Sequence, residues 1–235
     1  MGHVPYTADF FAALGTTITR LWHTTTSPPK KVIVLDCDNT LWQGVCGEVG
    51  PAALVIDEPR RRLQEFMVEQ TRAGRLLCVC SKNELADVEA VFDGRTDMPL
   101  TREHIVGWKV NWTAKSQNIR ELANELNLGL DSFVFVDDNP VEIAEVAANC
   151  PEVATIQIPE NSAEIPALLE HVWEFDSASA TDEDQQRTRM YQDQVARDRS
   201  RDQAPTLQDF IDSLELRIAI DPMDEADIRR VAQLT

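Results

Sequence analysis

The stretch Lys31-Val-Ile-Val-Leu-Asp36-Cys-Asp38-Asn-Thr40-Leu-Trp42 is the segment that decides the fold. It is a short apolar run, rich in β-branched residues, that ends in two carboxylates two positions apart. Because side chains alternate along a strand, Asp36 and Asp38 can point the same way where the strand leaves its sheet. Two carboxylates this close repel each other and are costly to desolvate without a compensating positive charge. The pattern therefore indicates either a divalent cation beside a phosphoryl-transfer site or an acidic turn after a core strand.

Later segments place polar side chains where such chemistry would need them. A second apolar strand ends at Ser81, and a third ends at Asp137 and Asp138. Between them, Lys115 opens a helical stretch. Strands that alternate with helices predict a parallel sheet, whose sites lie at the carboxyl ends of its strands. Singly, Ser81 is explained as a helix cap, Lys115 as a solvated charge and the aspartate pair as turn residues. Their order along the chain favours one shared site.

This order of residues resembles the four motifs of the haloacid dehalogenase (HAD) superfamily, and it is closer still to the FkbH-like (HAD-IIIC) branch. The resemblance covers about residues 5 to 175. The segments that carry it are Val34-Leu-Asp-Cys-Asp-Asn-Thr-Leu-Trp42, Val45-Cys-Gly-Glu48, Cys80-Ser-Lys-Asn83, Trp112-Thr-Ala-Lys-Ser-Gln-Asn-Ile119 and Phe135-Val-Asp-Asp-Asn-Pro140.

The resemblance implies a role for each motif residue. Asp36 is the expected nucleophile, which forms an aspartyl-phosphate, and Asp38 the expected general acid and base. Mg²⁺ is expected on Asp36, the backbone carbonyl of Asp38 and one carboxylate of the pair Asp137 and Asp138. The superfamily favours Asp138, although the sequence alone does not rank the pair. The residues expected to hold the phosphoryl group are Thr40, Ser81 and Lys115, and Asn39 is a further candidate for binding beside Thr40.

FkbH-like proteins dephosphorylate an activated three-carbon acid, typically 1,3-bisphosphoglycerate. They load its glyceryl unit onto the phosphopantetheine arm of an acyl carrier protein in polyketide assembly. The resemblance implies this activity here. Two alternatives stay open, a plain Mg²⁺ phosphatase and a non-catalytic docking module. Cys46, in the glycine-flanked segment Gly44–Gly47, is the candidate thiol for an acyl intermediate, against the alternative of a buried packing residue.

Composition limits the other function classes. A net charge of −18 argues against nucleic acid as a partner. No stretch reaches the ~20 apolar residues that span a membrane, and five cysteines without a disulfide pattern favour the cytoplasm. An acidic carrier protein would need a basic docking patch. The candidate is Arg60-Arg-Arg62 with Arg72 and Arg75, against the alternative of ordinary solvated charges.

The fold class predicted is α/β, a doubly wound parallel sheet of about five strands without a large cap domain. Residues 1–30 are an N-terminal helix, Thr7 to Trp22, with a connector, and 31–178 form the catalytic core. Residues 179–204 read as a polar helix or linker, and 205–235 as the start of a second, acyltransferase-like domain that the chain cuts short. The expected strands are 31–36, 75–80, 104–108, 133–137 and 153–158, and the expected core helices are 59–73, 84–92, 114–126 and 140–149.

Overall fold

A computed structural model of the chain describes residues 6–176 and Met190. The segments 179–204 and 205–235, predicted as a linker and as the start of a second domain, lie outside the described residues except for Met190. Both assignments therefore stay predictions.

Five parallel strands form one sheet in the order β3-β2-β1-β4-β5. Each strand lies within two residues of its predicted bounds, so the α/β, doubly wound fold class is confirmed. The strands are β1 Val32–Leu35, β2 Leu76–Ser81, β3 Ile105–Val110, β4 Phe133–Asp137 and β5 Ala154–Gln157.

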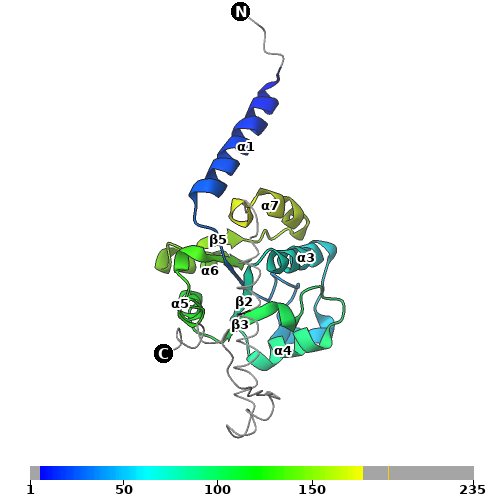
Figure 1. Cartoon of the computed structure of the whole chain (residues 1–235). Helices are drawn as coiled ribbons and strands as arrows, with labels where there is room; N and C mark the ends of the chain where they lie inside the picture. The colour runs from blue at the N-terminus through cyan, green and yellow to red at the C-terminus, as the bar shows by residue number, and fades with distance from the viewer. Residues whose placement is uncertain (1–5, 177–189, 191–235) are drawn as a thin grey trace, which may run out of the picture. The chain divides into compact units, whose positions relative to one another are not determined.

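Helices separate the strands and cover both faces of the sheet (Figure 1). The α-helices are α1 Ala8–Thr26, α2 Cys46–Val49, α3 Glu58–Arg72, α4 Leu85–Gly94, α5 Lys115–Glu125, α6 Pro140–Asn149 and α7 Ile165–His171. Short 3₁₀ turns lie at η1 Pro51–Ala53, η2 Arg102–His104, η3 Leu130–Ser132, η4 Ser162–Glu164 and η5 Trp173–Phe175. The prediction missed α2 and α7. It also ended α1 too early, because the threonines at 24–26 continue the helix. Their hydroxyls bond back to carbonyls of the preceding turn.

The apolar strands are buried on both faces, as a parallel sheet between two helical layers requires. Ile33 and Leu35 face a core shared with Leu63 and Met67 of α3, and with residues of α4 and α7. Alternate residues of the same strands face α5 and α6, which pack against each other on the other side. Every residue of β1 is therefore fully buried, and the first polar side chain after it emerges at the sheet edge.

The strand order brings the functional segments together. The chain runs outward from β1 to β3 and then returns to place β4 on the other side of β1. The carboxyl ends of β1, β2 and β4 therefore meet at the point where the winding reverses, which is where open α/β sheets carry their sites. Between β1 and β2 lie only α2, η1 and α3, and between β2 and β3 only α4 and η2. Neither insert forms a cap, as predicted.

Two arginines of the candidate basic patch do not lie on the surface. Arg60 and Arg75 are buried, 6% and 5% exposed, because their guanidinium groups bond backbone carbonyls inside the fold. Arg61 and Arg62 are exposed but paired with glutamates one turn away on the same helix. In the part of the chain that the structure describes, no helix is both long and apolar enough to cross a membrane.

Candidate active site

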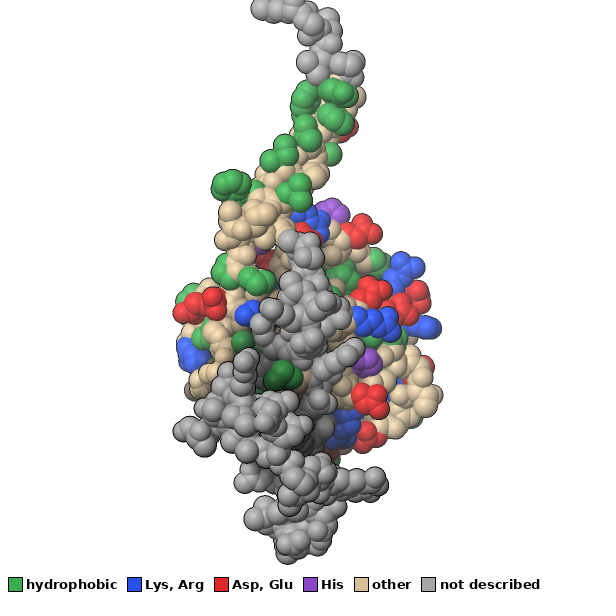
Figure 2. Space-filling view, viewed as in Figure 1, with side chains coloured by type: hydrophobic (Ala, Val, Ile, Leu, Met, Phe, Trp, Pro, Cys, Tyr) green, Lys and Arg blue, Asp and Glu red, His purple; other side chains and the backbone are tan. Residues whose placement is uncertain are grey.

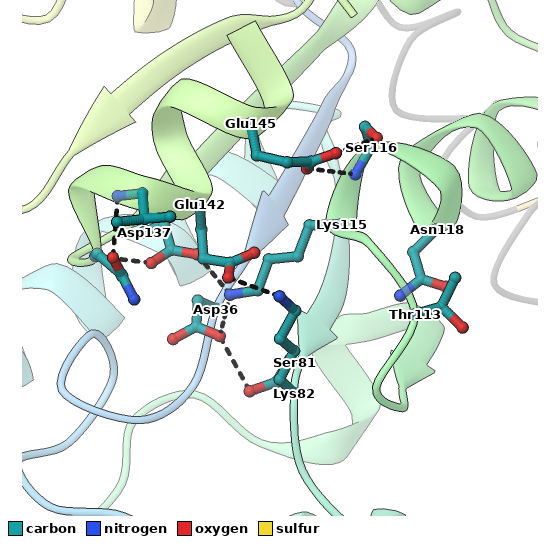
Figure 3. Close-up of polar contacts among 12 residues, drawn as sticks. Asp36, Ser81, Lys82, Thr113, Lys115, Ser116, Asn118, Asp137, Glu142 and Glu145 are labelled. Carbon is teal, nitrogen blue, oxygen red and sulfur yellow. Dashed lines mark hydrogen bonds and ion pairs between the residues drawn. The ribbon is translucent and has the colours of Figure 1, made fainter. Parts of the chain in front are cut away.

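Asp36 follows β1 directly and is buried, with 5% of its surface exposed. Its Oδ1 accepts hydrogen bonds from Ser81 Oγ at 2.9 Å and from Lys115 Nζ at 2.7 Å (Figure 3). Burial raises the pKa of Asp36 to about 6, and the charge of Asp137 adds to this shift, while Lys115 and Ser81 oppose it. The other oxygen, Oδ2, has no hydrogen-bond donor among the described residues.

Lys115 is the first residue of α5, and its ammonium is buried between two carboxylates. Nζ lies 2.7 Å from Asp36 Oδ1 and 2.5 Å from Asp137 Oδ2. Burial alone would lower the pKa of Lys115, but these two carboxylates outweigh it and raise the pKa above its usual value. Glu145 of α6 fixes the start of α5, because it accepts bonds from the backbone nitrogen and the hydroxyl of Ser116 (Figure 3).

Asp137 and Asp138, at the end of β4, differ in their hydrogen bonds. Asp137 is 1% exposed, and each of its oxygens has a donor, Lys115 Nζ for Oδ2 and the backbone nitrogen of Asn139 for Oδ1. Asp138 uses only Oδ1, which accepts from Thr40 Oγ1 at 3.3 Å. Burial raises the pKa of both carboxyl groups, and the charge of Asp36 adds to the shift of Asp138.

The structure corrects the role expected of Thr40. Its side chain is fully buried and does not line the pocket. Oγ1 donates to Asp138 Oδ1 and accepts from the Asp138 backbone nitrogen at 3.1 Å. Both hydrogen bonds of the Thr40 hydroxyl are made with Asp138, so this hydroxyl orients Asp138 instead of contacting a phosphoryl group.

Asp38 is held by three donors. Its Oδ1 accepts from Trp42 Nε1 at 2.8 Å and from the Cys46 backbone nitrogen at 3.1 Å, and its Oδ2 accepts from Asn83 Nδ2 at 3.0 Å. The same Asn83 amide donates to Ser81 Oγ at 3.0 Å. Asn83 and Ser81 therefore connect Asp38 to Asp36 in one hydrogen-bonded network.

Three carboxylates in the described part of the chain form a group that can hold a cation. Asp36, Asp137 and Asp138 each offer an oxygen, and these oxygens lie within 4.8 Å of one another. Carboxylate oxygens are the ligands that Mg²⁺ prefers. One ammonium does not compensate three carboxylates, so the donor set fits a divalent cation. The free Oδ2 of Asp138 favours this residue over Asp137 as the direct ligand.

Asn39 turns the chain away from the strand. Its φ of 58° is in the left-handed region, which asparagine tolerates better than most residues. Its Oδ1 accepts from the Gly44 backbone nitrogen at 3.0 Å, and its carbonyl accepts from the Arg60 guanidinium. Asn39 lines the pocket, but its side-chain oxygen holds the segment that follows the motif.

An ion pair lies at the rim of the same pocket. Lys82, after β2, places Nζ 2.6 Å from Glu142 Oε1 in the first turn of α6, and the two side chains point toward each other in Figure 3. The residues that line the pocket are Asp36, Asp38, Asn39, Ser81, Lys82, Asn83, Lys115, Asp137, Asp138, Asn139 and Glu142.

For Cys46, the structure favours the alternative of a buried packing residue over the candidate acyl-carrying thiol. The residue is 2% exposed, packs in the hydrophobic core and does not line the pocket. Burial raises the pKa of its thiol to about 12, and the charge of Asp38 adds to this shift. A buried, protonated thiol is a poor nucleophile. Its backbone nitrogen serves the site instead, as a donor to Asp38.

Sequence reasoning assigned no role to Trp42, Asn83 or Glu145, although the first two lie inside quoted motifs. A signal for Asn83 was available in the sequence. It follows Ser81, at the end of a strand, by two residues, and side chains two positions apart in extended chain lie on the same face. Trp42 and Glu145 gave no such signal. Trp42 reaches Asp38 through the shape of the turn after β1, and the partner of Glu145 lies on α5.

The fold agrees with a comparison to a solved structure. No protein-family model matches the sequence, and no curated protein matches it. The N-terminal part of the protein BF1531 from Bacteroides fragilis, described as containing a phosphatase domain complexed with Mg, is 30% identical with a TM-score of 0.66. The match covers 71% of this chain and 46% of that one, so this chain spans about half of its length.

Two further structures are more distant. A HAD family enzyme from Bacteroides thetaiotaomicron, in complex with magnesium and inorganic phosphate, is 9% identical with a TM-score of 0.44, over 56% of this chain and 96% of that one. The cobalt-bound deoxy-D-mannose-octulosonate 8-phosphate phosphatase of Haemophilus influenzae is 14% identical with a TM-score of 0.39, over 79% and 96%.

The fold and the site can be stated together. A five-stranded parallel sheet carries an Asp-x-Asp pair after β1, a serine at the end of β2, a lysine at the start of α5 and an aspartate pair at the end of β4. This chain is similar to the phosphatase domain of BF1531.

Proposed function

We propose that this chain is a Mg²⁺-dependent HAD-type phosphatase that acts through an aspartyl-phosphate on Asp36. The observation that carries the proposal is the arrangement around this one carboxylate. Ser81 and Lys115 hold Oδ1, Oδ2 is free of donors from the described residues, and the oxygens of Asp137 and Asp138 lie within 4.8 Å. The Mg-bound phosphatase domain of BF1531 supports the choice of metal.

The arrangement suits an in-line attack on phosphorus. Asp36 Oδ2 would form the new bond to phosphorus while the ester oxygen leaves, and Asp38 would protonate that oxygen and later activate water. Lys115 and Ser81 keep the attacking carboxylate in one rotamer. Lys115 has a third N–H, which would be available to a phosphoryl oxygen. A bound Mg²⁺ would neutralise the carboxylates and draw charge from the phosphoryl group.

Asp38, the proposed general acid, is held in a fixed position by hydrogen bonds. Trp42, Asn83 and the Cys46 backbone nitrogen hold both oxygens of Asp38 at the pocket. The set of motif residues is complete and connected by hydrogen bonds, which disfavours a docking module that has kept only the fold.

Hydrolysis of a generic phosphate monoester tests this first proposal. The purified chain should release phosphate with Mg²⁺ and lose this activity in excess EDTA. Absence of turnover on a broad panel of monoesters and acyl phosphates, with Mg²⁺ present, would contradict it.

We further propose that the natural substrate is 1,3-bisphosphoglycerate and that the glyceryl unit passes to an acyl carrier protein for polyketide biosynthesis. The support is the resemblance of the motifs to FkbH-like proteins and a pocket without a cap, which suits an acyl group delivered to a pantetheine arm. The five cysteines are free and buried, which fits a reducing cytoplasm.

The chemistry separates into two steps. Asp36 removes the phosphate ester at carbon 3. The pantetheine thiolate then attacks the acyl carbon, a C–S bond forms, the bond between the acyl carbon and the phosphate oxygen breaks, and inorganic phosphate leaves. Because Cys46 is buried, we propose direct transfer to the pantetheine thiol.

Intact-mass analysis of a carrier protein after incubation with the chain and 1,3-bisphosphoglycerate tests this second proposal. A mass increase of one glyceryl unit supports it. Phosphate release without any mass increase would leave the alternative, a plain phosphatase acting on a metabolite or a protein.

A further inference from the structure

The largest group of exposed apolar side chains in the described part of the chain lies on α1. Figure 2 shows these hydrophobic side chains gathered along the helix. None of the helix residues is buried, and Leu21 and Trp22 are 63% and 70% exposed. A surface of this kind on a chain with a net charge of −18 needs a partner to exclude water from it.

The spacing of the apolar residues is that of a helix–helix seam. Phe11, Leu14, Ile18 and Leu21 follow steps of three, four and three, which places them in one stripe. The stripe is also symmetric about position 16. Residue 11 mirrors 21, residue 14 mirrors 18, and the flanking Phe10 and Trp22 mirror each other.

This symmetry fits a second copy of the same helix running in the opposite direction. Across a two-fold axis, if residue i of one copy contacts residue j of the other, then residue j of the first copy contacts residue i of the other. In the antiparallel register centred on position 16, Leu14 meets Ile18 and Phe11 meets Leu21. A parallel pair would instead bring two strongly acidic domains to the same end of the seam, where their charges repel.

Charge argues for a copy of this chain over other partners. Asp9, Arg20 and His23 are the only residues of α1 that can carry charge. Arg20 is bound to Asp176 and to the Glu170 carbonyl. The apolar stripe therefore offers no cation to an acidic carrier protein, and it lacks the lysines and arginines with which amphipathic helices bind acidic membranes.

The available area is sufficient for a dimer. The six side chains at 10, 11, 14, 18, 21 and 22 are about half exposed, and large side chains offer 150–250 Å² each, so one copy presents on the order of 500 Å². Two copies would bury about 1,000 Å², the lower bound of a specific interface. The helix of 19 residues is about 28 Å long, enough for the whole stripe to pair.

We propose that the chain forms a homodimer through antiparallel pairing of α1 with α1 of a second copy. Sedimentation equilibrium of the full chain over a wide range of concentrations tests it. The mass should rise from 26.4 kDa toward twice that value for the wild type. Leu14→Asp and Ile18→Asp should stay monomeric, because each buries a carboxylate in the seam.

Thr16→Asp is the matched control. It adds the same charge to the same helix on the exposed face opposite the stripe, and it should dimerise like the wild type. A monomeric wild type at every concentration would overturn the proposal, as would Leu14→Asp or Ile18→Asp chains that still dimerise. If α1 is covered by residues 194–235 of its own chain or by another protein, the wild type stays monomeric.

Cross-linking tests the direction of the pair. Because the native cysteines are buried, a cysteine placed on α1 is the reactive one. A mixture of Leu14→Cys and Ile18→Cys chains should form the mixed disulfide, and each variant alone should form little. Efficient homodisulfide formation by Leu14→Cys alone would show a parallel pair and overturn the antiparallel register.

Discussion

The ammonium of Lys115 joins the ends of two neighbouring strands, because it lies 2.7 Å from Asp36 Oδ1 after β1 and 2.5 Å from Asp137 Oδ2 at the end of β4. A buried cation in this position compensates part of the carboxylate charge and also orients the proposed nucleophile. Substitution of Lys115 tests these two effects, and substitution of a surface lysine serves as the control.

Lys115→Met keeps the length of the side chain and removes its charge. We expect turnover of a phosphate monoester to fall by about 100-fold or more, as for other donors to developing charge. The metal-free variant should also melt at a lower temperature, because Asp36 and Asp137 lose their counter-ion inside the fold. Lys109→Met is the control, since Lys109 pairs with Glu121 and Glu125 on α5 outside the pocket. Equal turnover by the two variants would contradict the role of Lys115.

Asp36→Asn should abolish turnover while the fold is retained, because the amide keeps the shape but is not a nucleophile. Phosphate release and the circular dichroism spectrum measure the two effects. Asp131→Asn, at an exposed position before β4, should behave as wild type in both. Hydrolysis by Asp36→Asn at the wild-type rate would show that the nucleophile is another residue.

The strand ends could be predicted because their signal is local. Short continuous apolar runs followed by Asp36, Ser81 or Asp137 indicate both the strand and the end at which it stops. The topology of parallel sheets then brings these ends together without knowledge of any contact. This is why the proposed nucleophile, its serine and the aspartate pair were all found from the sequence.

The contacts that the prediction missed depend on packing between distant segments. Whether Arg60 faces solvent or bonds the Asn39 carbonyl is decided by how α3 lies on the turn after β1. Packing also decides whether the Thr40 hydroxyl faces a ligand or Asp138. It likewise decides whether Cys46, in the segment Gly44–Gly47, is open to solvent or buried. A pattern of residue types does not distinguish these alternatives, because burial of a single side chain arises from the tertiary fold.

The raised pKa of Asp36 has a consequence for stability. Its folded value of about 6 lies above the ordinary 3.8, so between these values the folded state holds a proton that the unfolded state has released. The metal-free chain should therefore lose stability as pH rises from about 4 to 6, by up to about 3 kcal/mol from this group. The free energy of unfolding in EDTA, measured for wild type and Asp36→Asn, isolates this contribution. The difference should change across this pH window, and a constant difference would contradict it.

Mg²⁺ should offset the loss of folding stability that ionised Asp36 causes at neutral pH. We expect the melting temperature of the wild type to rise with added Mg²⁺, since a ligand that binds only the folded state stabilises it. Asp138→Asn should lose most of this rise because it removes a direct ligand, whereas Asp131→Asn should keep it. An unchanged response of Asp138→Asn would show that Asp137 is the direct ligand of the pair.

Cys46→Ser tests whether a protein thiol carries the acyl group. With a pKa of about 12, the Cys46 thiol is ionised in about one molecule in 10⁵ at neutral pH. We therefore expect this variant to load a carrier protein at close to the wild-type rate, since the backbone nitrogen that donates to Asp38 is retained. Asp36→Asn, which should not load, is the control for the assay. If Cys46→Ser chains release phosphate normally but fail to load the carrier, the segment Gly44–Gly47 opens and the thiol forms the acyl intermediate.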